Sequence, residues 1–399
     1  MIDQTASSLS DREHRSFIPT YKRLPLEVER AEGMYIFTAD GRRYLDFLGG
    51  IAVNSLGHCH PSVVAAVEKQ LHRYAHVSNY FYQDAQIEFA EALREASAYD
   101  RVFLTNSGTE ATDGAMKFAR MHGSANGRSE IIGFSGGFHG RTYGALSIMD
   151  KPGYKDGMGP FLPATRVIPY NDASALEDTV GNDTCALMIE FLQGEGGIRE
   201  VDAAFVARMF ELREKFGFLV IADEVQAGGG RTGRFFSFEQ FGVRPDIVTV
   251  AKGLGGGLPL GAILIDESLA SVWSPGRHGT TFGGNALACA AGSAMLGELR
   301  NGLMERVAKV GEYAVAQLNT LRESFPALIK EVRGAGAMIG VELSMPAATI
   351  VDAMLERGVI VNATDETVLR LLPPMIYERR HVDEMVAVLN QVLRHHAAL

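Results

Sequence analysis

Cysteine is scarce in this sequence of 399 residues, which contains only Cys59, Cys185 and Cys289. An odd number of widely spaced cysteines argues against the disulfide framework that stabilises small secreted domains. Reduced cysteines are typical of a reducing compartment, so we expect a cytoplasmic protein. The first residues, MIDQTASSLSDREH, are polar and acidic, and we expect no secretory or transit segment among them.

An excess of basic charge is also missing. The chain has 38 lysines and arginines against 48 aspartates and glutamates, which gives a net charge of −10. It has no basic stripe with interleaved aromatic residues, so a nucleic-acid partner is not expected. It also has no run of 18 apolar residues, so we expect no membrane partner.

Glycine, by contrast, is plentiful at 44 residues, with clusters at 228–230 and 255–257. The segment AKGLGGGLPLGA lacks the order GxxxxGK[ST] of a P-loop, so nucleotide binding is not indicated. The segment GHCHP contains His58, Cys59 and His60, but a fourth ligand at a common zinc spacing is missing. We therefore predict no metal site, and we interpret GHCHP as the entry to a helix.

Short apolar runs alternate with helical patterns in the middle of the chain. The runs lie at residues 101–104, 130–134, 186–191, 218–223, 246–251 and 261–265. Several are apolar without alternation, which is typical of strands covered on both faces. This order predicts an α/β fold with a mostly parallel sheet covered by helices. Ligands of such sheets bind beyond the carboxyl ends of the strands.

The length of the chain predicts two domains, because one hydrophobic core rarely grows this large. Strand patterns followed by an amphipathic helix, at 332–343, 358–363 and 382–396, indicate a smaller α+β domain. We expect residues 61–290 to form the large domain and residues 291–399 the small one, with residues 1–60 part of the small domain.

One helix can also be placed before the large sheet. The segment from Pro61 to Tyr74 favours a helix, with the proline in its first turn and Val64, Val67 and Leu71 on the same face as the tyrosine.

Two strand ends carry the strongest chemical feature. Asp223 ends the apolar run FLVIAD, and Lys252 follows the run DIVTVA. Either residue alone would be interpreted as half of a structural ion pair, because buried charges need compensation. Together they suit pyridoxal 5′-phosphate, whose aldehyde bonds to a lysine amine and whose ring nitrogen needs an acidic partner to stay protonated. We predict Lys252 and Asp223 as the catalytic pair.

Two further segments suit the same cofactor. A strand, the turn NSGT and a helix follow one another at 101–120, so Ser107, Gly108 and Thr109 would offer amide and hydroxyl groups to a phosphate at a helix N-terminus. Phe138, in SGGFHGRTYG, could stack on a flat ring, and Arg141 could bind a carboxylate. By itself, each segment would be interpreted as an ordinary turn or loop.

With these residues assembled, the chain resembles the class III aminotransferases over nearly its full length. The shared motifs occur in the same order, namely GHCHP, NSGTE, FHGRT, QGEGG, DEVQ, GRTG, AKGLGGGLPLGA and TFGGNALACAAG. The resemblance implies a fold-type-I dimer that holds pyridoxal 5′-phosphate between its large and small domains.

The resemblance also assigns roles residue by residue. Lys252 matches the lysine that bonds to the cofactor, Asp223 the acid at the ring nitrogen, and Phe138 the stacking aromatic. Further cofactor positions are matched by Ser107, Gly108, Thr109, Val225, Gln226 and Thr281, the last of which would be contributed by the partner subunit of a homodimer.

Four residues match positions that bind substrate, namely Arg141, Glu195, Thr280 and Arg370. The resemblance implies that Arg141 binds the carboxylate remote from the reacting amine. It implies that Arg370 binds the α-carboxylate of glutamate and pairs with Glu195 when a donor with one carboxylate is bound. A plain salt bridge between Glu195 and Arg370 is the alternative interpretation.

Three segments, GGIAVN, HVSN and VLRLLPP, are most similar to members of the family that use acetylornithine. The implied reaction moves the terminal amine of N2-acetyl-L-ornithine to 2-oxoglutarate, giving N-acetyl-L-glutamate 5-semialdehyde and glutamate, a step of arginine biosynthesis. Gly50 stands where ornithine-using members carry a tyrosine, which disfavours free ornithine.

Some positions depart from the family pattern, namely Phe191, Leu192, Thr112, Asp113, Gly114, Ala227 and Gly229. The departures just before QGEGG and just after DEVQ could reshape the pocket and leave the acyl group of the donor open. Alternatives are therefore a 4-aminobutyrate, ornithine or succinylornithine aminotransferase, an aminomutase, or a binding protein that has kept the scaffold and lost catalysis.

Overall fold

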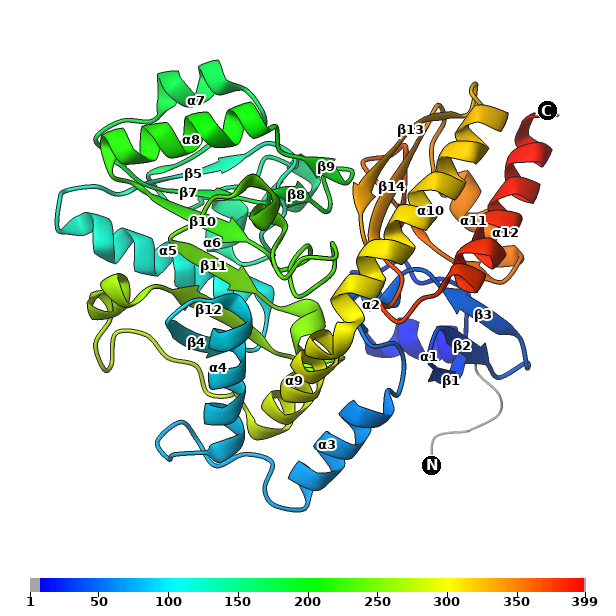
Figure 1. Ribbon diagram of the computed structural model, residues 1–399, viewed down its shortest axis with the longest axis horizontal. Coiled ribbons are helices and arrows are strands. Elements are labelled where there is room, and N and C mark those ends of the chain that lie inside the picture. The colour runs from blue at the N-terminus through cyan, green and yellow to red at the C-terminus, as the bar shows by residue number, and fades with distance from the viewer. Residues whose placement is uncertain (1–7, 398–399) are drawn as a thin grey trace.

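The computed structural model describes residues 8–397. It has two unequal parts, a large one built around a seven-stranded sheet and a small one with two four-stranded sheets (Figure 1). The helices α9 (Ala286–Glu298) and α10 (Met304–Ser324) lead from the large part into the small one. A π-helical turn, Leu299–Leu303, joins them, and Asn301 and Gly302 leave helical geometry there.

The strands of the large sheet lie in the order β4-β12-β11-β10-β7-β5-β6. Strand β12 is antiparallel to both its neighbours, and the other recorded pairs are parallel. The bounds are β4 Arg101–Thr105, β5 Glu130–Phe134, β6 Thr165–Ile168, β7 Thr184–Ile189, β10 Leu219–Asp223, β11 Ile247–Val250 and β12 Gly261–Ile265. The predicted α/β fold with a mostly parallel sheet is confirmed. Strand β6 is not among the predicted runs, because this edge strand keeps polar and exposed residues.

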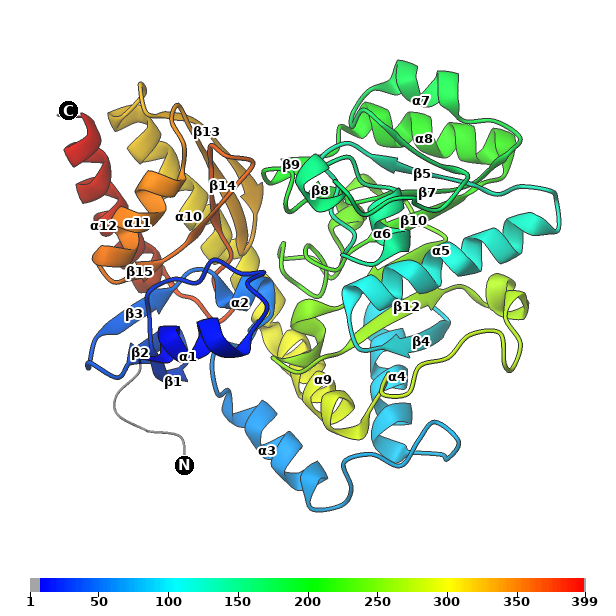
Figure 2. The same ribbon diagram turned by 180° about the vertical axis from the view of Figure 1, so that it is seen from behind.

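Helices cover both faces of this sheet. Helix α5 (Gly108–Ser124) packs against β7, β11 and β12 and lies in front of the sheet in Figure 2. Ile221 of β10 belongs to the apolar cluster of α5, whereas its neighbour Ala222 belongs to the cluster of α8 (Ala203–Phe216). Successive residues of one strand therefore meet different helices, which explains the continuous apolar runs. The other helices of this part are α4 Asp84–Ser97, α6 Tyr143–Ser147 and α7 Ala173–Thr179.

The small part is built from segments near both ends of the chain. Strands β1 (Val28–Glu32), β2 (Tyr35–Thr38) and β3 (Arg43–Asp46) form a sheet with β15 (Val359–Ile360) from the C-terminal end. The second sheet is antiparallel, in the order β13-β14-β17-β16. Its strands and the nearby helices are β13 Ile329–Ala335, β14 Met338–Leu343, β16 Asn362–Thr364, β17 Val368–Leu371, α11 Ala348–Glu356 and α12 Arg379–Ala397. The expected domain boundaries stay predictions.

Short elements complete the chain, namely α1 Leu9–Ser16, α2 Gly49–Ala52, β8 Leu192–Gln193 and β9 Arg199–Glu200. None of the helices between residues 8 and 397 has both the length and the apolar composition needed to cross a bilayer.

Helix α3 (Pro61–Leu71) begins as the sequence predicts, with His60 as N-cap and Pro61 in the first turn. The helix packs on α9 through the buried Val63 and through Val67, whereas Val64 and Leu71 of the predicted face are 48% and 58% exposed.

Candidate active site

The carboxyl edge of the large sheet brings the predicted acid and lysine to neighbouring strand ends. Asp223 is the last residue of β10 and pairs in parallel register with Thr249 of β11. Lys252 follows β11 and begins the 3₁₀ turn Lys252–Gly255 with a φ of +47°. A lysine is uncommon in this left-handed region of backbone space. The two side chains that the sequence singles out therefore belong to one site.

The Lys252 amine is buried, and burial is the largest influence on its pKa. Desolvation lowers the pKa of Lys252, and the charge of Arg370 lowers it further. The carboxylates of Asp223, Glu190 and Glu195 oppose this shift without cancelling it. The amine therefore loses its proton more readily than an exposed lysine, and the neutral amine is the nucleophilic form.

Asp223 is held by a histidine that the sequence argument missed. The buried His139 lies with its Nδ1 at 2.7 Å from the Asp223 carboxylate, and the amide of Val225 donates to the same carboxylate at 3.0 Å. Desolvation lowers the pKa of His139, but the hydrogen bond and charge of Asp223, helped by Glu190, outweigh it and leave the pKa raised. His139 therefore keeps a donor directed at Asp223.

A second missed acid lies beside this pair. Glu190 follows β7 directly and is buried, and its carboxylate accepts from the amides of Phe138 at 2.8 Å and Gly194 at 3.0 Å. Desolvation and the nearby charge of Asp223 raise the pKa of Glu190 to about 7. The carboxylate joins the loop of Phe138 to the loop of Glu195. Its position after an apolar run is the only sequence signal for it.

The predicted phosphate-binding residues lie at the N-terminus of α5. Ser107 is the N-cap and its hydroxyl accepts from the amide of Glu110. Gly108 and Thr109 follow, and the first amides of a helix have no acceptor within it. A Cβ on Gly108 would lie 2.6 Å from Val225 Cγ1, so only glycine permits this approach to the loop after β10. The helix terminus and Val225 therefore form one wall.

The Thr109 side chain connects this wall to the loop after β5. Its hydroxyl lies 2.9 Å from the hydroxyl of Thr142. A Cβ on Gly140, which has a φ of +124°, would lie 2.2 Å from Thr109 Oγ1. The glycine of the FHGRT motif thus allows the Phe138–Arg141 loop to meet the helix N-terminus.

The side chains of Phe138 and Arg141 both lie against the ring of Tyr154. The Phe138 ring meets the Tyr154 ring edge to face, with centroids 5.8 Å apart. The Arg141 guanidinium lies 3.7 Å from the centre of the Tyr154 ring and 5.7 Å from that of Phe138. Arg141 is exposed and has no carboxylate partner among the described residues.

The predicted arginine and glutamate form an ion pair. Arg370 of β17 is buried, and its Nη1 lies 2.5 Å from Glu195 Oε1. Asn362 accepts from Arg370 Nε at 3.2 Å, and Gln226 accepts from its Nη1 at 3.4 Å. Desolvation raises the pKa of Glu195, but the charges of Arg370, Lys252 and Lys151 lower it by more. Gln226, expected at the ring oxygen, thus also contacts the arginine.

Thr280 and Thr281 are not part of this cluster within a single chain. Thr280 accepts from Asn106, which precedes Ser107, at 3.1 Å. Thr281 is exposed, and both threonines line a separate cavity of about 840 Å³ together with Tyr80. Their predicted roles stay predictions.

Two departures from the family pattern have a packing reason. A Cβ on Gly114 of α5 would lie 2.5 Å from Ile263 Cδ1, so glycine fits the close contact between this helix and β12. Phe191 is buried between the rings of Phe238 and Phe241, each 5.8 Å away between centroids.

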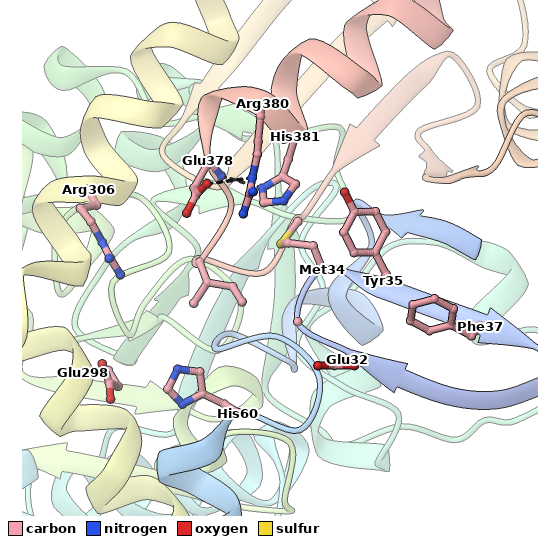
Figure 3. A pocket seen from close by; sticks show the side chains of 12 residues that line it. Glu32, Met34, Tyr35, Phe37, His60, Glu298, Arg306, Glu378, Arg380 and His381 are labelled. Atoms are coloured by element: carbon pink, nitrogen blue, oxygen red, sulfur yellow. Dashed lines mark hydrogen bonds and ion pairs between the residues drawn. The ribbon is translucent and has the colours of Figure 1, made fainter.

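A different hollow, of about 520 Å³, lies between the β1–β2 turn, the start of α3, the α9–α10 junction and the start of α12 (Figure 3). Acids and bases are mixed on its walls, as Glu298, Arg306 and the ion pair of Glu378 with Arg380 illustrate. No lysine is among its described lining residues, so it offers no anchor for an aldehyde. The candidate site is the cluster at the sheet edge.

Comparison with known proteins agrees with this arrangement. The family model described as Aminotransferase class-III matches residues 17–393. An acetylornithine aminotransferase of Methanocaldococcus jannaschii is 46% identical over 96% of this chain and 97% of that protein. The structure of an acetylornithine aminotransferase from Elizabethkingia anophelis has a TM-score of 0.87 at 31% identity, covering 97% of this chain and 98% of that one. An amine transaminase from an uncultivated Pseudomonas species, solved in a PLP-bound form, has a TM-score of 0.88 at 29% identity, covering 95% and 98%.

Proposed function

The chain belongs to the class-III aminotransferase family, and from this membership we propose that it transfers the terminal amine of N2-acetyl-L-ornithine to 2-oxoglutarate. The products are N-acetyl-L-glutamate 5-semialdehyde and glutamate, and the reaction serves arginine biosynthesis. The observation that carries the proposal is the pairing of Lys252 and Asp223 at adjoining strand ends, beside an ion pair between Arg370 and Glu195.

The chemical character of the cluster fits pyridoxal 5′-phosphate. A lysine with a lowered pKa suits the aldehyde, and a buried carboxylate held by His139 suits the ring nitrogen. The N-terminus of α5 suits the phosphate, because unpaired amides and the helix dipole favour an anion there. Residues Ser107, Gly108, Thr109, Phe138, Asp223, Val225, Gln226 and Lys252 would hold the cofactor, with Thr281 added by a partner subunit.

When bound, the cofactor supplies an electron sink that stabilises the carbanion formed next to the reacting nitrogen. Asp223 would face the ring nitrogen, and its hydrogen bond with His139 would hold the carboxylate in that position. Lys252 would hold the cofactor through its amine between turnovers and, once released by substrate, would carry a proton to and from the reacting substrate carbon.

The two arginines divide the carboxylates of the substrates between them. Arg141 binds the carboxylate of the donor that lies far from the reacting amine. Arg370 is neutralised by Glu195 while a donor with one carboxylate is bound. It becomes free for the α-carboxylate of 2-oxoglutarate when Glu195 turns away. The same pocket can then accept a monocarboxylate and a dicarboxylate in turn.

The backbone at Gly50 favours this donor over free ornithine. Gly50 has a φ of +64°, and a Cβ there would lie 3.0 Å from Asn54 Nδ2. A tyrosine at this position, which the resemblance associates with ornithine binding, would be strained in this backbone.

A homodimer completes the proposal. Tyr80 is 95%, Phe81 64%, Tyr82 100% and Phe282 59% exposed, and the last of these follows Thr281. Exposed aromatic residues at such density mark a surface for association. A partner seated there would cover them and could bring its Thr281 to the phosphate.

The function is tested with a panel of amino donors at a fixed 2-oxoglutarate concentration. N2-acetyl-L-ornithine should be among the best donors by kcat/KM, ahead of L-ornithine and 4-aminobutyrate, as measured by glutamate formation. A preference for either of the other two would overturn the proposed donor. Turnover without 2-oxoglutarate would indicate an aminomutase instead.

The lysine is tested by borohydride reduction of the holoenzyme followed by peptide mass spectrometry, which should find the cofactor fixed to Lys252. Lys252→Ala should abolish turnover while the circular dichroism spectrum is retained, and Lys309→Ala, at an exposed helix position, serves as the matched control. An active Lys252→Ala variant would refute the assigned role.

A further inference from the structure

One buried side chain holds two loops of the candidate site at once. Glu190 follows β7, and its Oε1 accepts from the Phe138 amide at 2.8 Å while its Oε2 accepts from the Gly194 amide at 3.0 Å. Phe138 lies in the loop after β5, and Gly194 directly precedes Glu195. In the proposed function, the first loop carries the stacking aromatic and the second carries the acid that pairs with Arg370. A single carboxylate therefore connects the cofactor wall to that acid.

The backbone of the second loop is confined on its other sides as well. A Cβ on Gly194 would lie 2.4 Å from Gln226 Oε1, so the loop packs directly against that side chain. The Gln193 side chain donates to the carbonyl of Ser135 at 2.9 Å, which ties the same two loops a second time. The Glu195 side chain is 24% exposed, so it is the part of this loop that has room to turn.

Stability alone does not explain a carboxylate at the position of Glu190. It is 6% exposed, and no cation lies within ion-pair distance of it in the part of the chain that the structure describes. Desolvation and the charge of Asp223 raise its pKa to about 7, against the opposing charge of His139 and the two amide bonds. A buried acid without a cation destabilises a fold unless hydrogen bonds compensate it. The two amides are that compensation, and holding them is what the side chain does.

The ion pair of Glu195 with Arg370 decides which substrates the proposed site accepts, because a masked arginine suits one carboxylate and a free arginine suits two. We propose that Glu190 is a positioning residue that sets this choice. Its hold on the Gly194 amide keeps Glu195 beside Arg370 while the donor is bound. Without this hold, Arg370 is left open to a dicarboxylate donor. The inference rests on the proposed function and deepens it.

The test compares N2-acetyl-L-ornithine with L-glutamate as amino donors for the holoenzyme, each in a single turnover without a keto acid and followed by the absorbance of the cofactor. In Glu190→Gln, the side-chain nitrogen would face one of the two backbone amides, so one hydrogen bond is lost. The ratio of the second-order rate constant for acetylornithine to that for glutamate should fall roughly fivefold to tenfold. Glu190→Asp keeps the charge but is too short to reach both amides, and it should lower the ratio as well.

Two further variants show whether the effect passes through the ion pair. Glu224→Gln is the matched control, because Glu224 is also a buried acid but accepts from the amides of Ser237 and Phe238, outside both loops. It should leave the ratio unchanged. Glu195→Gln should lower the ratio by itself. The addition of Glu190→Gln to it should then lower the ratio no further, because both changes act on the same contact.

Amide hydrogen exchange, measured by mass spectrometry, gives a readout that does not depend on turnover. In Glu190→Gln, the peptides that contain the Phe138 and Gly194 amides should exchange faster than in the wild type, because these amides lose their acceptor. Glu224→Gln should leave the exchange of both peptides unchanged.

The outcomes separate the two proposals. A wild-type donor ratio in a folded Glu190→Gln or Glu190→Asp variant, or unchanged exchange of both peptides, overturns the inference and leaves the proposed function standing. Equal falls of the ratio in Glu190→Gln and Glu224→Gln, or a further fall in the double variant, also overturn it, because the effect would not pass through Glu195. Inactivity of the wild type with N2-acetyl-L-ornithine overturns the proposed function and the inference together.

Discussion

The Asp223 carboxylate is buried, and the His139 imidazole is the nearer of its two hydrogen-bond partners. A buried carboxylate is costly unless donors compensate it. The imidazole supplies such a donor at 2.7 Å, and the amide of Val225 supplies another at 3.0 Å. We infer that His139 is a positioning residue that acts on the cofactor ring through Asp223.

Replacement of His139 by leucine should therefore lower kcat/KM by roughly tenfold to a hundredfold, because a hydrogen bond to a charged group is worth about 1.5–3 kcal/mol. The pH dependence of kcat/KM should also change, because leucine can neither bind a proton nor donate a hydrogen bond to the Asp223 carboxylate. Steady-state kinetics between about pH 5 and about pH 9 would measure both effects. His139→Asn, which keeps a donor, should recover part of the loss. A leucine variant with the wild-type profile would show that the histidine is not needed.

Another buried acid, Glu224, follows β10 and joins the loop there to Ser237 and Phe238 through hydrogen bonds. It accepts from the amide of Ser237 at 2.9 Å, from the Ser237 hydroxyl at 2.5 Å and from the amide of Phe238 at 3.3 Å. Desolvation outweighs these bonds and raises the pKa of Glu224 to about 8. The folded protein therefore holds this proton to higher pH than the unfolded chain does.

The raised pKa of Glu224 makes the stability of the folded protein depend on pH. Between the ordinary glutamate pKa of about 4.5 and the folded value of about 8, the unfolded state has already lost the proton, so stability falls as the pH rises. Glu224→Gln removes this contribution, and the fall of Tm from about pH 6 to about pH 9 should be smaller than in the wild type. Thermal unfolding followed by circular dichroism measures it, with the exposed Glu214→Gln as control. An unchanged pH dependence of Tm would contradict the shifted pKa.

At the scale of elements, helix α5 shows how tertiary contact overrides local preference. Glycine inside a helix costs about 1 kcal/mol relative to alanine, so Gly114 is unfavourable by propensity alone. The structure explains it, because a Cβ at this position would lie 2.5 Å from Ile263 Cδ1 and 3.2 Å from His278 Nε2. Ile263 is buried in β12, which leaves it little freedom to move.

Gly114→Ala should consequently destabilise the protein, by about 1–3 kcal/mol, instead of stabilising it. Gly297→Ala is the matched control, because this glycine also lies inside a helix and no atom would lie within 4 Å of its Cβ. The control should be as stable as the wild type or more stable, by up to about 1 kcal/mol. Urea unfolding of both variants decides the matter, and a stabilised Gly114→Ala would show that the contact with β12 relaxes easily.

At the scale of the whole molecule, Arg231 connects the two parts of the chain. It is buried, and its guanidinium donates to the carbonyls of Ala337 and Pro373 and to the hydroxyl of Ser55 at 3.2 Å. Desolvation lowers the pKa of Arg231 to about 10. No carboxylate pairs with it within residues 8–397. The guanidinium thus fixes the loop after β10 to the segment that follows Arg370.

The exposed aromatic surface gives a second expectation at this scale. In the proposed homodimer this surface is the interface, so Tyr82→Asp, at a fully exposed position, should give a monomer in sedimentation velocity, because an interface core excludes charge. Val28→Asp, at a 56% exposed position on another surface, should not. Activity should fall with the dimer if Thr281 acts across the interface. A Tyr82→Asp variant that remains dimeric would place the interface elsewhere.

The sequence by itself determined the α/β class, most strand positions and the two residues at adjoining strand ends, Asp223 and Lys252. It could do so because buried parallel strands are continuous apolar runs, and parallel strands end at the same edge. It also singled out Glu195 and Arg370, which the structure pairs at 2.5 Å. The roles assigned to these residues stay predictions.

Only the tertiary structure decided the supporting contacts. His139 lies against Asp223, Glu190 joins two loops, and Lys151 shares the Tyr154 ring with an arginine from another turn. Such contacts join residues far apart in the chain and follow from how strands and loops pack, so no local spacing announces them. A lone histidine or glutamate in the sequence is equally compatible with a solvated surface, and only burial beside a charge gives it a role.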